Sequence, residues 1–267
     1  MKEIQFPAGT IRIADANTNR IGEGLRVLEE AARFVLNDGV LSERLKNLRR
    51  LTRASLVSGI YGLYAVIDSD CLKGRNRLET TSQVLPGGVK LVQLRDKFTP
   101  KKRLYELAIA VKKLCVENEA IFIINDHMDI VLATDADGLH LGQDDIPVKI
   151  ARRLLPVDKL IGCSVTTAPE AKQAKDDGAD YLACGAIYPT GTKTDCPVVG
   201  LDALGEIKRA VSLPLVAIGG INIENVAEVF AAGADSAAVV SALVLARSPA
   251  LAAKEMLQRI EVCHEQT

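Results

Sequence analysis

The chain has 267 residues, of which 48% are hydrophobic, and a formal net charge of -1. This length and apolar content suffice for a full-sized core, while the near-neutral charge and the absence of tryptophan argue against nucleic acid as the main partner. No apolar stretch approaches the length of a membrane span and residues 1–10 lack the pattern of an export signal, so we expect a cytoplasmic protein with no membrane partner.

The first part of the chain, from about Arg12 to Ser58, has a helical pattern. Ile21, Leu25 and Leu28 recur at helical spacing, and a second run follows a break near Gly39. Two short amphipathic helices cannot bury both apolar stripes alone, so we expect them to pack against the rest of the chain or a second subunit in a homo-oligomer. The predicted division is a helical extension over residues 1–58 and a domain over residues 59–267.

From Tyr61 onward, short apolar segments alternate with helical ones. The eight predicted strands lie near Leu63–Ile67, Leu91–Leu94, Ile121–Ile124, Gly138–Leu141, Leu160–Cys163, Tyr181–Cys184, Leu215–Ile218 and Ala237–Val240. Strands that alternate with amphipathic helices form right-handed βαβ units, and eight of them predict an α/β fold, a closed (β/α)8 TIM barrel. An open doubly wound sheet is the alternative, but it favours an early Gly-x-Gly-x-x-Gly turn, which does not follow the first strand.

The second predicted strand ends in the pentapeptide Gln93-Leu94-Arg95-Asp96-Lys97. Because side chains alternate along a strand, Gln93, Arg95 and Lys97 should face one way and Leu94 and Asp96 the other. An amide with two cations suits a polyanionic group, since arginine offers a planar fork and lysine a mobile charge. The alternative is that these charges are simply solvated on a loop. We favour the anion site because similar polar residues recur at other strand ends.

Two carboxylates follow the next strands. Asp126 comes just after the third predicted strand, behind Asn125, and Asp145 lies in the turn after the fourth. In a barrel the carboxyl ends of the strands form the active site, so the two should approach each other. Carboxylates without nearby thiolates suggest a hard cation such as Mg²⁺, which also takes phosphate oxygens. The alternative is that each aspartate only caps a helix.

Later strand ends carry hydroxyls and glycines. Ser164 follows the fifth predicted strand, and the long segment Tyr188–Asp195 after the sixth strand is typical of an anion-binding loop. Gly220, Val240 and Ser241 follow the last two strands, where many barrels bind phosphate through backbone N–H groups. The pattern predicts a diphosphate-like ligand and a monophosphate in one mouth. No nucleophilic dyad is evident, and His140 is expected to be a satisfied residue of the barrel wall or helix layer.

At these residues the chain resembles the thiamine phosphate synthases. The resemblance covers roughly Tyr61 to Ile260 and implies a Mg²⁺-dependent transferase that joins a pyrimidine diphosphate to a thiazole phosphate, giving thiamine phosphate and diphosphate. It implies pyrimidine diphosphate contacts through the pentapeptide and through Asn125, Ser164 and Lys193, magnesium ligation by Asp126 and Asp145, and thiazole phosphate contacts at Thr190, Gly191, Thr192, Gly220, Val240 and Ser241. The residues it suggests for assisting catalysis are Arg95, Lys97, Ser164 and Lys193.

Residues Asp15–Phe34 resemble a short form of the N-terminal helical extension of some bacterial members of this family. Two alternative functions remain: a barrel like the thiazole tautomerases, which would need no diphosphate site, and a non-catalytic sensor of thiamine precursors. Arg95, Lys97, Asp126, Asp145 and Lys193 argue against both, since neither function requires this diphosphate and metal set.

Overall fold

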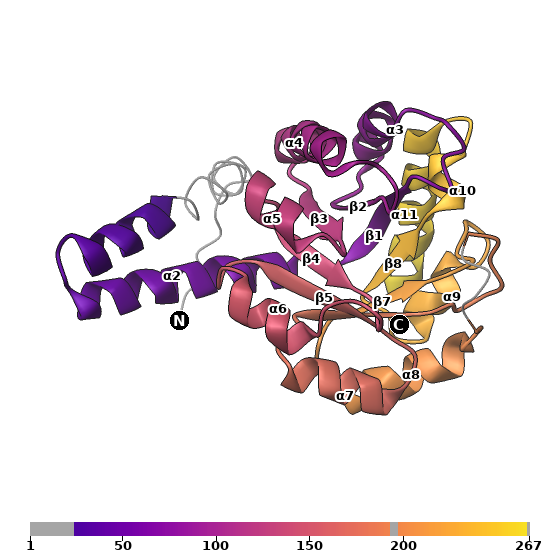
Figure 1. Ribbon diagram of the computed structural model, residues 1–267. Coiled ribbons are helices and arrows are strands. Elements are labelled where there is room, and N and C mark those ends of the chain that lie inside the picture. The colour runs from indigo at the N-terminus through magenta and orange to yellow at the C-terminus, as the bar shows by residue number, and fades with distance from the viewer. Residues whose placement is uncertain (1–23, 193–196, 266–267) are drawn as a thin grey trace. The chain divides into compact units, whose positions relative to one another are not determined.

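The computed structural model describes residues 24–192 and 197–265 (Figure 1). Contacts divide the chain into two compact units, residues 1–55 and residues 56–267. No helix in the described part of the chain is both long and apolar enough to cross a membrane.

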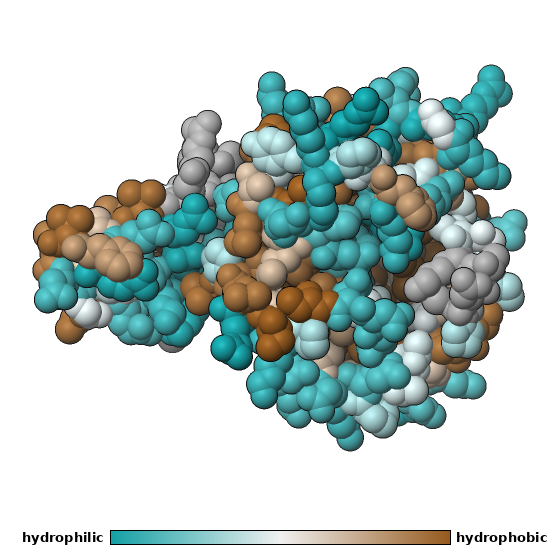
Figure 2. Space-filling model, viewed as in Figure 1, coloured by the Kyte–Doolittle hydropathy of each residue, from teal (hydrophilic) through white to brown (hydrophobic). Residues whose placement is uncertain are grey.

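The N-terminal unit is helical where the structure describes it. Residues 24–34 are helical, and α2 follows as Gly39–Ser58. Ala32, Leu45 and Arg49 are buried, and Arg49 is ion-paired to Glu29 at 2.7 Å. Apolar side chains nevertheless remain exposed on both helical segments and in the turn between them, among them Val27, Leu28, Phe34, Val35, Leu36, Val40, Leu48 and Leu51. Figure 2 shows brown surface over these helices. The pair therefore leaves much apolar surface uncovered, as expected of so short a unit.

The second unit is a closed barrel of eight parallel strands in chain order, with β8 paired to β1. The strands are β1 Gly62–Asp68, β2 Leu91–Arg95, β3 Ile121–Asn125, β4 Gly138–Leu141, β5 Leu160–Val165, β6 Tyr181–Cys184, β7 Leu215–Ile218 and β8 Ser236–Val239. The predicted (β/α)8 fold is confirmed, and the observed strands overlap every predicted strand.

Helices separate the strands and surround the barrel (Figure 1). They are α3 Arg77–Val84, the short 3-10 helix η1 Leu85–Gly87, α4 Lys101–Glu117, α5 Met128–Thr134, α6 Val148–Leu154, α7 Ala168–Asp176, α8 Gly200–Ala210, α9 Val226–Ala231, α10 Ser241–Val244 and α11 Pro249–Glu265. Thr167 caps the start of α7, where its hydroxyl accepts the N–H of Glu170 at 3.4 Å.

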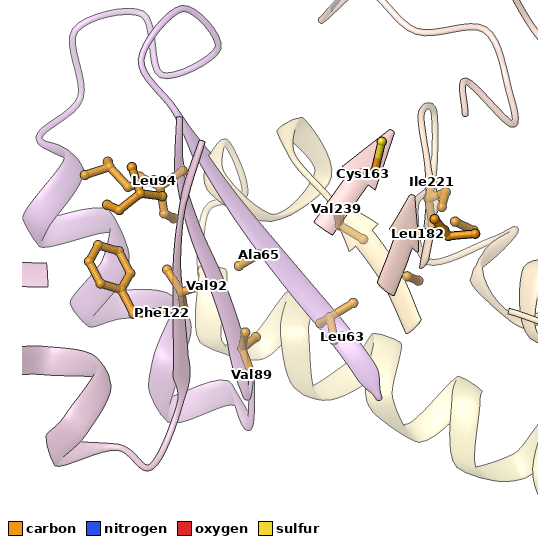
Figure 3. Packing of buried hydrophobic residues seen from close by; sticks show 14 of the residues in the cluster. Leu63, Ala65, Val89, Val92, Leu94, Phe122, Cys163, Leu182, Ile221 and Val239 are labelled. Atoms are coloured by element: carbon orange, nitrogen blue, oxygen red, sulfur yellow. The ribbon is translucent and has the colours of Figure 1, made fainter. Parts of the chain in front are cut away.

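Side-chain alternation along the strands sorts the core into two layers. Leu63, Ala65 and Ile67 of β1 face the helices and join the large outer cluster, whose packing Figure 3 shows. Tyr64 and Val66 of the same strand belong to a smaller inner cluster that fills the barrel. Because the alternation continues to the end of each strand, the inward positions that follow this cluster open at the carboxyl ends of the strands.

An aspartate precedes each of the strands β4, β6 and β8 and makes the same contact there. Each aspartate accepts the N–H of the first or second residue of the preceding strand: Asp137 from Phe122, Asp180 from Ile161 and Asp235 from Leu215, each at 2.8 Å. The repeated Gly-Ala-Asp sequence before β6 and β8 is therefore a strand-linking motif, in which glycine ends the helix and aspartate ties two strands together.

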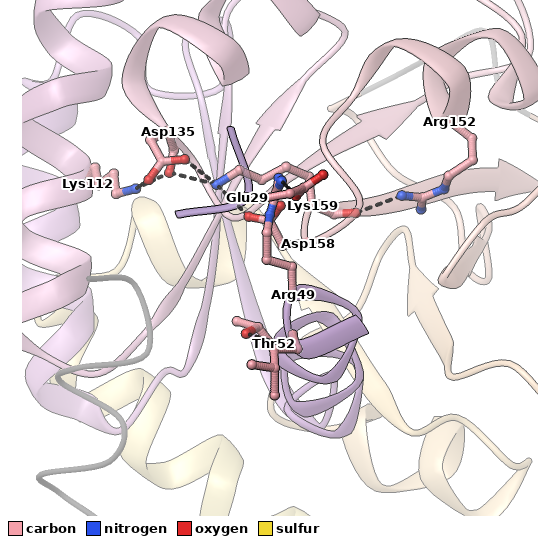
Figure 4. A network of polar contacts seen from close by, with 9 residues as sticks. Glu29, Arg49, Thr52, Lys112, Asp135, Arg152, Asp158 and Lys159 are labelled. Carbon is pink, nitrogen blue, oxygen red and sulfur yellow. Dashed lines mark hydrogen bonds and ion pairs between the residues drawn. The ribbon is translucent and has the colours of Figure 1, made fainter. Parts of the chain in front are cut away.

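A second polar network lies at the same amino ends of the strands. Figure 4 shows Asp135, which precedes β4, between Lys112 of α4 and Lys159, which precedes β5. The Lys112 Nζ to Asp135 Oδ2 distance is 3.5 Å, and Lys159 is ion-paired to the same carboxylate. These contacts stabilise the end of the barrel opposite the polar strand ends described below.

Replacement of Asp180 tests the strand-linking motif. Asp180→Ala removes the acceptor of the buried N–H of Ile161 and the carboxylate that is ion-paired to Arg152. We expect the free energy of unfolding, measured by urea denaturation, to fall by about 2 kcal/mol. The control is Asp176→Ala at the exposed end of α7, which should change stability little. Equal losses in the two variants would contradict the role assigned to the motif.

Candidate active site

A cavity of about 280 Å³ opens at the carboxyl ends of the barrel strands. Its lining includes most of the residues that the sequence singled out, namely Gln93, Arg95, Lys97, Asn125, Asp126, Asp145, Ser164, Thr190, Thr192, Gly220, Val240 and Ser241. Residues separated by up to 148 positions in the sequence thus meet in one mouth. This follows from barrel closure, which brings the ends of all eight strands together.

Three of the predicted positions lie apart from this cavity or face away from it. Leu94 is buried in the outer cluster against the helices. Asp96 accepts the N–H groups of Phe98 at 3.2 Å and Thr99 at 2.9 Å and is ion-paired to Arg77, so it organises the turn into α4. Gly191 is exposed and is not among the lining residues. Lys193 lies outside the described residues.

Arg95 is held in place by an aspartate that the sequence analysis missed. Asp68 ends β1, pairs in register with Arg95 across the sheet, and forms an ion pair with its guanidinium. The other oxygen of Asp68 accepts the N–H groups of Asp70 at 2.8 Å and Cys71 at 3.1 Å. Asp68 is 2% exposed, so the pair presents Arg95 in one orientation to the cavity. The sequence contains a signal for this residue, because alternation along β1 from Tyr64 and Val66 places the Asp68 side chain on the inward side of the strand.

Asp126 and Asp145 face each other across the mouth. Burial, a side-chain hydrogen bond to Asp145 and its charge raise the pKa of Asp126 to about 6. One oxygen of Asp145 also accepts the N–H of Gly142 at 2.7 Å, and Lys97 Nζ lies 3.8 Å from Asp126 Oδ2. Two adjacent carboxylates repel each other unless a proton or a cation lies between them, so the pair suits a hard cation.

The carboxylate pair would supply only part of a metal's coordination sphere. Among residues 24–192 and 197–265, no group of three or more histidine, cysteine, aspartate or glutamate side chains is placed to hold a metal ion. Mg²⁺ commonly binds through one or two carboxylates and keeps water and phosphate oxygens as its other ligands. The donor set therefore fits Mg²⁺ bound together with a phosphorylated substrate.

The far side of the mouth carries glycines and hydroxyls. Gly219 and Gly220 follow β7 with φ angles of +103° and +68°, and a Cβ at Gly220 would lie 2.7 Å from the Pro189 carbonyl oxygen. Only glycine fits this combination of left-handed backbone and close approach. Thr190, Val240 and Ser241 border the same part of the cavity, which leaves backbone and hydroxyl groups to meet a ligand.

The two histidines near strand ends have different surroundings. His127 bridges two loops, with Nδ1 2.8 Å from Lys101 Nζ and Nε2 2.9 Å from the Asp96 carbonyl oxygen. His140 lies inside the barrel, where burial lowers its pKa to about 4. It is satisfied, as expected, through Tyr181 and Ser164. The expected location in the wall or helix layer is wrong, because position 140 faces inward and borders the cavity.

The cysteines that the structure describes with their side chains are buried and free, namely Cys71, Cys115, Cys163 and Cys184. Burial raises the pKa of Cys163 to about 11, so this thiol, beside Ser164, stays protonated at neutral pH. Buried, unpaired thiols of this kind usually have a structural role.

Comparison with known proteins gives concordant matches. A family model described as thiamine monophosphate synthase matches residues 63–243, and a model of the ThiD2 family matches residues 12–83. A thiamine-phosphate synthase of Methanospirillum hungatei is 47% identical over 193 residues, 72% of this chain and 93% of the relative. One from Moorella thermoacetica is 46% identical over 197 residues, 73% of this chain and 94% of the relative.

A solved structure agrees with these matches. The thiamine phosphate pyrophosphorylase from Pyrococcus furiosus superposes with a TM-score of 0.72 at 36% sequence identity, covering 77% of this chain and 98% of that chain. The similarity thus extends over nearly the whole length of these relatives and covers the barrel of this chain.

The raised pKa of Asp126 predicts a pH-dependent cost to stability. The folded state binds the proton of Asp126 more tightly than the unfolded chain does, because the pKa of an aspartate in an unfolded chain is near 3.8. Stability should therefore fall as pH rises from about 4 to about 6 and stay lower above that. We expect Asp126→Asn to raise the melting temperature at pH 7.5, with a smaller gain at pH 5. The control Asp129→Asn removes an exposed carboxylate paired with Lys101 and should not stabilise. A destabilised Asp126→Asn at pH 7.5 would argue against carboxylate repulsion.

Proposed function

The chain belongs to the thiamine monophosphate synthase family, and from that premise we propose that its cavity binds a pyrimidine diphosphate and a thiazole phosphate side by side. Members of this family are transferases, and the chain is an enzyme of that class. The observation that carries the assignment of the cavity is the meeting of Arg95 and Lys97 with the carboxylate pair Asp126 and Asp145 in one mouth. A diphosphate with a divalent cation would satisfy both groups together.

The diphosphate half of the cavity is the side formed by β2, β3, β4 and β5. Arg95 offers guanidinium N–H groups beyond those paired with Asp68, while Lys97 has an exposed ammonium group 3.8 Å from Asp126 Oδ2. Gln93, Asn125 and Ser164 add neutral polar groups, and Lys193 is assigned here from the sequence alone. A planar fork and a mobile charge together suit two linked phosphates.

The monophosphate half is the side formed by the loops after β6, β7 and β8. Gly220, Val240, Ser241 and the hydroxyls of Thr190 and Thr192 border it, and Gly191 lies between the two threonines. The glycine lets the backbone approach a ligand closely, and backbone N–H groups after the last two strands commonly bind phosphate in barrels. This half suits the phosphate of the thiazole.

The reaction we assign is a dissociative substitution. The amino group of the pyrimidine feeds electron density toward the exocyclic methylene, the bond to the diphosphate breaks, and the thiazole nitrogen then forms the new bond to the methylene carbon. Bound Mg²⁺ would supply neutralisation of charge on the departing diphosphate. Arg95 and Lys97 stabilise the same developing charge, and Arg95 needs little reorganisation because Asp68 already orients it. The barrel wall shields the cationic intermediate from water.

Diphosphate release tests this proposal. Purified protein is given the pyrimidine diphosphate and the thiazole phosphate with and without Mg²⁺, and diphosphate and thiamine phosphate are both measured. We expect release only with metal, and a fall in rate on the order of 10²–10³ in Asp126→Asn. Asp129→Asn, outside the cavity, should retain the wild-type rate. Thiazole phosphate binding without diphosphate release would instead favour the tautomerase-like or sensor function.

Residues 1–58 are proposed as an extension that is separate from catalysis. The cavity is lined by residues of the barrel unit, so chemistry should not require the extension. We expect a chain of residues 56–267, which keeps Leu56 and Val57 on the inner cluster of the barrel, to retain diphosphate release within about threefold of the full chain, a change below about 1 kcal/mol. Sedimentation of both chains would test whether the exposed apolar side chains of the extension join subunits. Loss of activity in a folded truncated chain would overturn the separation.

A further inference from the structure

We propose that a buried chain of hydrogen bonds beneath the cavity fixes the direction in which the Ser164 hydroxyl donates. Its members are Gln93, Tyr64, Tyr181, His140 and Ser164, from five different strands. Tyr64, Tyr181 and His140 are then positioning residues, which act on substrate through the two ends of the chain. The catalytic meaning of this inference rests on the proposed function, although the hydrogen-bond chain itself can be tested without substrate.

The chain is continuous at hydrogen-bonding distance. Gln93 Nε2 lies 2.9 Å from the Tyr64 hydroxyl, which lies 3.1 Å from the Tyr181 hydroxyl. The Tyr181 hydroxyl lies 3.1 Å from His140 Nδ1, and His140 Nε2 lies 3.0 Å from Ser164 Oγ. Gln93 and Ser164 both border the cavity, so the chain joins two parts of its lining through the barrel interior.

Burial makes every link of the chain necessary. Tyr64, Tyr181, His140 and Gln93 are 1%, 0%, 6% and 5% exposed. A hydroxyl or ring nitrogen buried to this degree costs free energy if it lacks a partner. Hydrogen positions must therefore satisfy all the members together, which makes the orientation of one member depend on the next.

The amide at one end sets the direction. Gln93 Nε2 can only donate, so the Tyr64 oxygen accepts from it and the Tyr64 hydrogen points to Tyr181. Tyr181 in turn donates to His140 Nδ1. A neutral His140 then carries its proton on Nε2 and donates it to Ser164 Oγ. The Ser164 hydrogen is left to donate into the cavity.

Gly162 of β5 leaves space for the Tyr181 and His140 rings of the hydrogen-bond chain. A Cβ at position 162 would lie 2.1 Å from Tyr181 Cζ and 2.6 Å from His140 Nδ1. Its φ is not in the left-handed region, so this glycine is required by the close approach of the two rings and not by its backbone. The barrel interior is thus shaped around the Tyr181 to His140 contact.

The direction gives the cavity a defined polarity. Ser164 presents a donor, and Gln93, whose Nε2 is turned to Tyr64, presents its amide oxygen as an acceptor. A bound substrate must then offer an acceptor at Ser164, and it can donate to the amide oxygen of Gln93. Reversal of the hydrogen-bond chain would make Ser164 an acceptor and turn the Gln93 NH2 group away from Tyr64, so the two ends recognise substrate as a coupled pair.

The tautomer of His140 reports the direction in solution. We would record ¹⁵N chemical shifts of the histidine rings in the full chain at pH 8 and assign His140 by separate replacement of His127 and His264 with glutamine. The expected state is protonated Nε2 and unprotonated Nδ1. A His140 that is protonated on Nδ1 would overturn the proposal.

Gln93→Glu tests transmission along the chain. A carboxylate at position 93 only accepts, so Tyr64 must donate to it, every hydrogen bond must reverse, and His140 should become protonated on Nδ1 although two tyrosines intervene. Gln83→Glu makes the same change on an exposed face of α3 and should leave His140 unchanged. An unchanged His140 in folded Gln93→Glu would overturn the coupling.

Tyr181→Phe tests the same link by another route, and it serves if Gln93→Glu fails to fold. Loss of the hydroxyl removes the donor to Nδ1, so His140 should lose its single tautomer, and kcat/KM for diphosphate release should fall about threefold to tenfold. Tyr105→Phe, on the exposed side of α4, should change neither. If Tyr181→Phe kept both the tautomer and the rate, the proposal would be wrong. Absence of release by the wild-type chain would contradict the proposed function alone, since the tautomer is measured without substrate.

Discussion

Alternation of side chains along closed parallel strands is the constraint on which the rest of this structure depends. Each barrel strand sends one set of side chains to the helices and the other to the interior, as β1 does with Leu63 and Tyr64. In the interior, mainly apolar side chains and two tyrosines form the inner cluster, and most of the charged and polar residues of the cavity lie at the last inward positions. The active-site mouth is therefore the top layer of the barrel core.

The mouth contains charges of both signs. Some of them compensate each other within the protein, and others do not. Asp68 and Arg95 compensate each other, so this pair orients a cation with little unbalanced charge. Asp126 and Asp145 do not compensate each other, and the raised pKa of Asp126 reflects first its burial and then the hydrogen bond to Asp145 and the charge of Asp145. A site that keeps two carboxylates adjacent is less stable without a cation, which is the expected cost of a site organised for a charged ligand.

The hydrogen-bond chain below the mouth means that the barrel interior orients cavity residues as well as forming the core. Apolar side chains such as Val66 and Leu91 could fill that space with less dependence on hydrogen-bond geometry. Instead, Tyr64, Tyr181 and His140 place hydroxyl and imidazole groups there in a single connected set. Because each group is buried, the set has few arrangements in which all its members are satisfied, and this gives the cavity a fixed pattern of donors and acceptors.

Local patterns in the sequence determined the elements of this protein and the inward side of each strand. The alternation in Gln93 to Lys97 and the apolar strand segments depend on neighbouring residues, so strand positions and most of the cavity lining could be predicted. The tertiary structure alone decided which distant groups touch: Asp68 with Arg95, Tyr181 with His140, and Asp96 with Arg77 at the turn into α4. These contacts depend on how the closed barrel sets neighbouring strands in register, a property of all eight strands together that no single segment encodes.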